Sequence, residues 1–221
     1  MENSYDSLED FFLSINNKTN YLVLRNYEGF SSGVFLLDHP DIDILCDNSE
    51  NFLLLIKSKS RTNNIKDTIH RKVIIGEKDV AVDIRSVGDG YYCSEWEREM
   101  LETKVLYNNL FYVLNTENYY YSLLYHAHFQ KDVISNDYVT KLRMMGRSLG
   151  VSDKDSISLT TLEAYMRKKN YKFTYPIYPA GIAHFEKVEK GLIERNYIRI
   201  INRVLFNIKV NLIKLLLWVK K

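Results

Sequence analysis

Cysteine, long apolar runs and some common nucleotide-binding motifs are scarce or missing in this 221-residue chain. The two cysteines, Cys46 and Cys93, form no CxxC or CxxH pattern, so we expect two buried free thiols in a reducing compartment. No stretch of about 18 uncharged apolar residues occurs, which argues against a membrane-spanning helix. Residues 1–20 have no basic segment followed by an apolar core, so we expect no signal peptide. These absences favour a cytoplasmic protein.

Phosphate-binding motifs and evenly spread positive charge are also lacking. The chain contains neither GxxxxGK[ST] nor GxGxxG, which argues against a P-loop or a Rossmann site. The formal net charge is +2, yet seven basic residues and no acidic one follow Glu194, so the part before that segment is mildly acidic. A basic surface is the usual electrostatic signature of a protein that binds nucleic acid. The charge distribution therefore argues against a nucleic-acid partner.

Hydrophobic periodicity and turn residues divide the chain near residue 115. Before that point the patterns predict helix, strand, strand, helix, strand, strand, helix and strand, at residues 6–17, 20–27, 41–46, 49–60, 71–76, 79–87, 94–102 and 109–115. Helices are predicted after it at residues 116–131, 135–150 and 158–170. We therefore expect an α/β fold of the α+β type. A small mixed sheet would form a core at residues 1–115, followed by a helical region at 116–183 and a basic amphipathic helix at 184–221.

Two carboxylates occupy the apolar strand predicted at residues 41–46. Asp41 and Asp43 are two residues apart and therefore project from the same face of a strand, with the intervening isoleucines on the core face. Asp83 lies in another apolar strand, "VAVDIR", and would join them if the two strands are neighbours. Three adjacent carboxylates need a cation, and oxygen ligands suit Mg²⁺ or Mn²⁺. The alternative is a solvated polar strand face.

A Gly/Ser segment, then Asp-x-Asp on a strand, then a third Asp on a later strand resembles the DNA polymerase beta-like nucleotidyltransferase superfamily. The resemblance covers about residues 20–90, and the family's adjacent Gly-Ser pair has an interrupted form here, "GFSSG". It implies a minimal nucleotidyltransferase fold with Asp41, Asp43 and Asp83 as catalytic, metal-binding residues. It also implies that the Gly/Ser segment binds phosphate through Gly29, Ser31 and Ser32.

The activity implied by this resemblance is metal-dependent nucleotidyl or phosphoryl transfer from a nucleoside triphosphate or nucleotide-activated donor. The acidic body favours a small acceptor, such as a sugar or polyol phosphate, and the basic tail suits surface-glycan (polysaccharide) biosynthesis beside a membrane. Two alternatives resemble other branches of the family. One is a phospho-alcohol transferase of the phosphocholine-transferase and fukutin-like type, and the other is a toxin–antitoxin-type nucleotidyltransferase acting on protein or RNA. The competing class is a non-catalytic scaffold or oligomerisation protein.

Two arginines are candidates for phosphate binding. Arg25 would bind a phosphate bidentately or pair with Glu28. Arg85 lies on the same strand face as Asp83 and would either hold that carboxylate or bind phosphate.

The helical half offers two further candidates, and one basic run is interpreted structurally. His126 and Lys131 are candidates for contacts to the acceptor or the nucleotide. His126 and His128 are two residues apart and would face different directions on a helix, which makes them a poor metal pair. Cations are favoured at helix C-termini, so the solvated end of the helix predicted at 49–60 accounts for Lys57, Lys59 and Arg61.

The C-terminal segment has a heptad-like apolar seam flanked by basic residues. The seam consists of Ile198, Ile201, Leu205, Ile208, Leu212, Leu215 and Val219. Three interpretations remain open: a helix packed on the body, a homodimer seam, or a helix lying on an anionic membrane surface. The last would place the protein at the membrane periphery.

Overall fold

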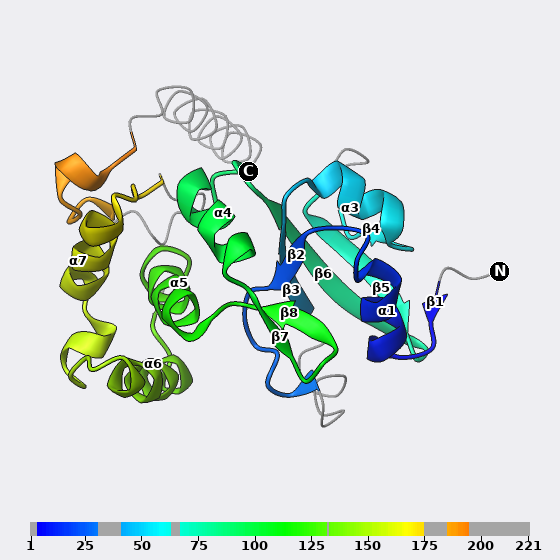
Figure 1. Ribbon diagram of the computed structural model, residues 1–221, viewed down its shortest axis with the longest axis horizontal. Coiled ribbons are helices and arrows are strands. Elements are labelled where there is room, and N and C mark those ends of the chain that lie inside the picture. Colours follow the sequence, from blue (N-terminus) through cyan, green and yellow to red (C-terminus); the bar gives the residue numbers. More distant parts are fainter. Residues whose placement is uncertain (1–3, 31–40, 63–66, 132, 175–184, 195–221) are drawn as a thin grey trace, which may run out of the picture.

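The computed structural model describes residues 4–30, 41–62, 67–131, 133–174 and 185–194. Within these residues eight strands form one mixed sheet, accompanied by six α-helices (Figure 1). The strands are β1 (Ser4–Tyr5), β2 (Tyr21–Val23), β3 (Asp41–Cys46), β4 (Lys59–Ser60), β5 (His70–Ile75), β6 (Lys78–Ser86), β7 (Val105–Tyr107) and β8 (Phe111–Val113). The helices are α1 (Leu8–Ile15), α3 (Ser49–Leu55), α4 (Ser94–Glu102), α5 (Thr116–Phe129), α6 (Asn136–Ser148) and α7 (Leu159–Lys169). The α/β class is confirmed.

The sheet has the strand order β1-β5-β6-β3-β2-β8-β7, with β4 paired to β5. Its centre is the parallel pair β3 and β6, in register from Asp41 opposite Ala81 to Cys46 opposite Ser86. Strands β5 and β6 form an antiparallel hairpin, joined at Gly76 and Glu77. Both of these residues have positive φ, 52° and 69°, as a tight hairpin turn of type I′ requires. The two aspartate-bearing strands predicted from the sequence are therefore neighbours.

The two faces of this sheet are covered by different helices. Ile42 and Ile44 are fully buried on the face shared with Tyr21 of β2, whose ring packs near Phe12 of α1 and Phe52 of α3. Figure 1 shows α1 and α3 on one side of the sheet and α5, α6 and α7 gathered on the other. Alternation along β3 turns Asp43 towards the second side. The functional side chains therefore face the helical half, and the isoleucines anchor the strand to its core.

Several predicted boundaries differ from the observed ones. The strand predicted at residues 20–27 ends at Val23. The helix predicted at 49–60 ends at Leu55, and the chain then becomes extended and forms the short edge strand β4. Lys59 lies in β4, with Lys57 before the strand and Arg61 directly after it, so the basic run belongs to a sheet edge rather than to a helix end.

A hairpin replaces the single strand predicted at residues 109–115. Strand β7 precedes the turn and β8 follows it, antiparallel to β7 and parallel to β2. Asn108 and Asn109 form the turn with φ values of 49° and 56°, a conformation that asparagine tolerates better than most residues. The missed signal was this Asn-Asn pair.

The end of the described chain is not the start of a long α-helix. Residues 185–194 contain turns and the short 3₁₀-helix η4 (Lys190–Leu192), and Ile193 bridges to Phe173. The heptad-like seam lies outside the described residues. No helix in the described part of the chain is long and apolar enough to cross a membrane.

Both cysteines are buried free thiols, as predicted. Burial raises the pKa of Cys46 to about 12 and that of Cys93 to about 11. Because only the thiolate is a good nucleophile, neither thiol is suited to catalysis at neutral pH.

A close approach at Gly146 of α6 supports the helical half. A Cβ at this position would lie 2.7 Å from the Cβ of Ser156 and 3.5 Å from the ring of Tyr120 on α5. We expect Gly146→Ala to lower the free energy of unfolding by about 1–3 kcal/mol, because this overpacking exceeds the gain in helix propensity of roughly 1 kcal/mol. Urea denaturation measures the change. The double variant Gly146→Ala/Ser156→Gly should recover part of the loss, and a single variant as stable as the wild type would contradict the close packing.

Candidate functional site

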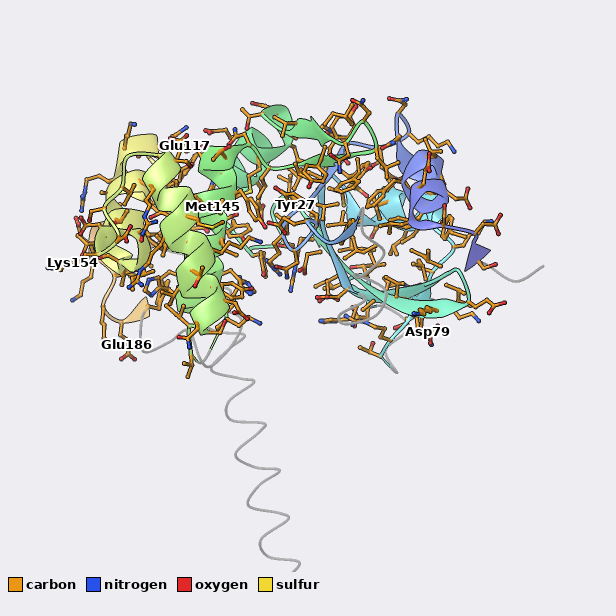
Figure 2. All side chains as sticks on the ribbon, turned by 90° about the horizontal axis from the view of Figure 1, so that it is seen from below. Tyr27, Asp79, Glu117, Met145, Lys154 and Glu186 are labelled. Atoms are coloured by element: carbon orange, nitrogen blue, oxygen red, sulfur yellow. The ribbon has the colours of Figure 1, made fainter. Side chains whose placement is uncertain are left out.

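A cleft of about 260 Å³ lies between the sheet and the helical half. Figure 2 shows these two parts, the helices marked by Met145 and the sheet by Asp79, with Tyr27 between them. The cleft is lined by Arg25, Asn26, Asp41, Asp43, Asp83, Arg85, Tyr91, His126, Gln130, Lys131 and Tyr138. The structure thus brings together seven of the ten residues that the sequence analysis nominated.

The centre of the cleft is a pair of carboxylates on adjacent strands. Asp43 of β3 stands directly opposite Asp83 of β6 in the parallel register. Asp41 lies two residues before Asp43, on the same strand face, and is exposed. Asp43 is buried and Asp83 is half-buried. Three oxygen-bearing side chains therefore line one cleft, as the DxD and "VAVDIR" strands predict.

Arg25 neutralises the inner carboxylate. Its Nη2 donates to Oδ1 of Asp43 at 2.9 Å, and both side chains are nearly excluded from solvent. Burial opposes the charge of Arg25, but the Asp43 carboxylate outweighs it and keeps the arginine pKa above its usual range. Glu28 pairs instead with Lys141 at 2.6 Å and accepts from the Tyr119 hydroxyl. The alternative that Arg25 pairs with Glu28 is wrong.

Arg61 neutralises the outer carboxylate. It forms an ion pair with Asp83, and about a third of each side chain is exposed. Arg61 immediately follows β4 and reaches Asp83 because its backbone N–H donates to the carbonyl of His70 on β5. The prediction that this residue belongs to a solvated helix end missed its contact with the site. Within the described residues, no three histidine, cysteine, aspartate or glutamate side chains stand together as a ready metal site.

Arg85 is held by a tyrosine ring and a loop carboxylate. Its guanidinium carbon lies 4.2 Å from the centroid of the Tyr91 ring, and its Nη1 lies 3.9 Å from Oδ2 of Asp89. The guanidinium of Arg25 is 5.8 Å from the same ring. Two buried guanidinium groups therefore lie within 6 Å of one tyrosine ring, whose π-face favours cations. Arg85 forms an ion pair with Asp89, and Asp83 forms one with Arg61.

The loop that presents Tyr91 is fixed by two carboxylates. Asp89 accepts from the backbone N–H of Tyr91 at 2.7 Å, and the fully buried Glu97 accepts from Gly88 at 2.7 Å and from Tyr92 at 3.1 Å. Gly88 has φ 85°, which only glycine adopts readily. Glu97 binds this loop from the first turn of α4, whose N-cap is Cys93.

His126 of α5 closes the cleft from the helical side. Its Nδ1 contacts Oε1 of Gln130 and lies 3.2 Å from the hydroxyl of Tyr91, and its ring stacks on Tyr138 of α6. Burial first, and then the charge of Arg25, hold the pKa of His126 well below its usual range, so the imidazole is neutral at pH 7. A neutral imidazole adds hydrogen-bonding capacity without further positive charge.

Lys131 supplies a cation at the mouth of the cleft. It follows α5, is exposed, and lies 6.0 Å from the centroid of the Tyr138 ring. His128 does not line the cleft; its Nε2 lies 3.1 Å from the carbonyl of Ile157. The two histidines therefore face different directions, as expected for residues two apart on a helix.

The predicted phosphate-binding segment is described only at its start. Gly29 lies in a turn outside the cleft lining, and Ser31 and Ser32 lie outside the described residues. The same segment, "GFSSG", also has the GxSxG spacing of a hydrolase nucleophile elbow. An elbow needs its serine at the tip of a strand, whereas β2 ends at Val23, so the described chain offers no such context.

Sequence reasoning missed four lining residues: Asn26, Tyr91, Gln130 and Tyr138. Only Tyr91 had a local signal, because "GDGYY" combines turn glycines with aromatic residues directly after an aspartate-bearing strand. Tyr138 and Gln130 reach the cleft through the packing of α5 against α6, which periodicity does not specify.

Comparison with other proteins adds no family assignment. No family model, curated protein or solved structure matches this chain.

The buried ion pair between Arg25 and Asp43 yields a stability prediction. We expect Arg25→Ala to lower the free energy of unfolding by about 3–5 kcal/mol, because it leaves the Asp43 carboxylate buried without its partner. Guanidinium chloride denaturation measures the loss. The double variant Arg25→Met/Asp43→Leu, which removes both charges and keeps apolar volume, should be markedly more stable than Arg25→Ala. Equal stability of these two variants would show that the pair is solvated.

Proposed function

We propose that this chain transfers a nucleotidyl or phosphoryl group, in a metal-dependent reaction, from a nucleotide donor to a small acceptor. The observation that carries the proposal is the register of the sheet, in which Asp43 stands opposite Asp83 while Asp41 shares their face. These carboxylates line a cleft together with two buried arginines. The arrangement supports a DNA polymerase beta-like nucleotidyltransferase core.

The donor set fits Mg²⁺ or Mn²⁺. Asp41, Asp43 and Asp83 offer hard carboxylate oxygens from two neighbouring strands, and Mg²⁺ is commonly held by one or two carboxylates together with substrate phosphates. In the structure Asp43 and Asp83 are engaged by Arg25 and Arg61, so these guanidinium groups would give up the carboxylates to the metal. When bound, the metal would supply Lewis-acid stabilisation of the phosphoryl oxygens.

The cations of the cleft suit the donor phosphates. Arg25 and Arg85 would bind phosphate oxygens through charge-assisted hydrogen bonds once Arg25 is released from Asp43. Their packing against Tyr91 limits the side-chain entropy that binding would cost. Lys131 would add a third positive charge from the mouth of the cleft. This chain's contribution to catalysis would be the positioning and electrostatic stabilisation of the transferred group.

The helical wall suits a polar acceptor of small size. His126 and Gln130 present hydrogen-bonding groups, and the rings of Tyr91 and Tyr138 lie beside His126. A cleft of about 260 Å³ matches a small molecule rather than a nucleic-acid duplex. A sugar or polyol phosphate is therefore the acceptor class we favour.

Nucleotide-dependent stabilisation tests this function. Each nucleoside triphosphate is screened with Mg²⁺ or Mn²⁺ by thermal unfolding of the wild-type chain. We expect the nucleotide that binds to raise the free energy of unfolding by about 2.7 kcal/mol when its concentration is a hundredfold above Kd. Asp43→Asn and Asp41→Asn should abolish that increase. The control is Asp79→Asn, because Asp79 lies on the same strand as Asp83 but pairs with Lys72 at 2.6 Å.

Two outcomes would decide against the proposal. If no metal–nucleotide combination shifts the unfolding of the wild type, the scaffold alternative gains. If a nucleotide stabilises the chain equally in the aspartate variants, it binds elsewhere. A positive result leads to incubation with nucleotide labelled at the α- or γ-phosphate and a panel of sugar and polyol phosphates, where the label found in the product identifies the group transferred.

A further inference from the structure

A histidine outside the cleft lining extends the row of the two central carboxylates. His70 of β5 stands directly opposite Asp83 of β6, which in turn stands opposite Asp43 of β3. Residues directly opposite one another project from the same sheet face, so the three side chains form one row across three strands. Asp and His are both common metal ligands. The row therefore carries more ligand groups than the DxD pattern revealed.

His70 and Asp83 form the type of antiparallel pair in which the two Cα atoms lie closer together. The N–H of Ile84 donates to the carbonyl of Ile69 at 2.9 Å, which makes His70 and Asp83 a non-hydrogen-bonded antiparallel pair. The Cα atoms of such pairs lie about 4.5 Å apart, closer than in hydrogen-bonded pairs. Their side chains can therefore reach a common ion.

A second carboxylate orients the imidazole of His70. Oδ2 of Asp67 lies 2.9 Å from Nδ1 of His70, while Oδ1 accepts from the backbone N–H groups of Ile69 at 2.9 Å and of His70 at 3.0 Å. The Thr62 hydroxyl also donates to Oδ2 of Asp67 at 2.9 Å, so this carboxylate is held in place beside the imidazole. Because Nδ1 faces the Asp67 carboxylate, Nε2 on the opposite side of the ring is directed away from it. Metal-binding histidines almost always have this outer carboxylate or an equivalent.

We propose that His70 and Asp83 together bind a divalent transition metal, with Asp67 orienting the imidazole. The proposal deepens the proposed function, on which it rests for the role of Asp83. With one imidazole and one carboxylate as protein ligands, the remaining coordination positions are open to water and to substrate oxygens. An imidazole ligand favours Mn²⁺ and later transition metals over Mg²⁺, so this site would set the metal preference of the cleft.

Arg61 would compete with that metal for the Asp83 carboxylate. It occupies the Asp83 oxygen that the ion needs, but both side chains of this pair are about one-third exposed. Ion pairs at such exposure are weak, so a metal displaces the guanidinium at little cost. Removing Arg61 is therefore expected to strengthen metal binding, the opposite of what removing His70 does.

Metal binding without nucleotide tests this inference. Mn²⁺ is titrated into the full chain and followed by electron paramagnetic resonance, with histidine labelled by ¹⁵N in a parallel sample. We expect a bound Mn²⁺ signal with hyperfine coupling to histidine nitrogen. His70→Ala and His70→Gln should remove the coupling and weaken binding on the order of tenfold or more, and Asp67→Asn should weaken it by about 10–100-fold. Arg61→Ala should tighten it, and Mg²⁺ should compete poorly.

The controls separate this inference from a folding defect and from the proposed function. Circular dichroism melting identifies any variant that fails to fold, and Asp79→Asn should keep wild-type Mn²⁺ affinity. Absence of histidine coupling in the wild type, or unchanged affinity in both His70 variants, would overturn the proposal. Histidine-coupled Mn²⁺ binding without any nucleotide effect would uphold this site and reject the transferase. The opposite result is nucleotide stabilisation that is lost in Asp43→Asn but kept in His70→Ala, with no hyperfine coupling between Mn²⁺ and histidine nitrogen. That result would uphold the transferase and reject the His70 site.

Discussion

Asp43 and Asp83 stand side by side on the parallel strands β3 and β6, and their mutual repulsion has to be neutralised by cations. The structure supplies one guanidinium for each: Arg25 from the end of β2 and Arg61 from the end of β4. These two contacts differ in kind. The inner pair is nearly excluded from solvent, whereas the outer pair is about one-third exposed. The sheet centre is thus electrostatically balanced in a way that leaves one carboxylate easier to release than the other.

Tyr91 connects Arg25 of this charge arrangement with Arg85 of the cleft. Both Arg25 and Arg85 lie near the tyrosine ring, and the position of the ring depends on a loop fixed by Asp89 and Glu97. A buried carboxylate is costly unless its oxygens are hydrogen-bonded, and the backbone N–H groups of Gly88 and Tyr92 donate to Glu97. The Glu97 carboxylate therefore helps to fix the loop that carries Tyr91.

The sequence pattern predicted the two aspartate-bearing strands of the site correctly but missed the hairpin and the arginine contact around them. Alternation in "DIDILC" and "VAVDIR" predicted both aspartate strands and their faces, because a period of two residues is a strong signal when one face is fully buried. It did not predict that the two strands are neighbours, which the sheet pairing shows. The Asn-Asn hairpin at β7 and β8 was missed because the strands are only three residues long. Arg61 was assigned to a helix end because an apolar run such as "NFLLLI" satisfies a helix pattern beyond the point where Ile56 becomes extended.

Long-range pairing explains what remained out of reach. Arg25 pairs with Asp43, eighteen residues away, rather than with its close neighbour Glu28. The position of His70 opposite Asp83 follows from the pairing of β5 with β6. A single histidine next to a predicted strand gives no sequence signal for that contact.

The helical half contributes to the net charge of the cleft. His126, kept neutral by burial and by the charge of Arg25, adds no cation to a cleft that already has Arg25, Arg85 and Lys131. Those three cations match the three lining aspartates in number, so the cleft is close to electroneutral as it stands. Binding of divalent metal would leave it with excess positive charge, which a phosphate-rich ligand would neutralise. Metal and nucleotide are therefore expected to bind cooperatively, each lowering the electrostatic cost of the other.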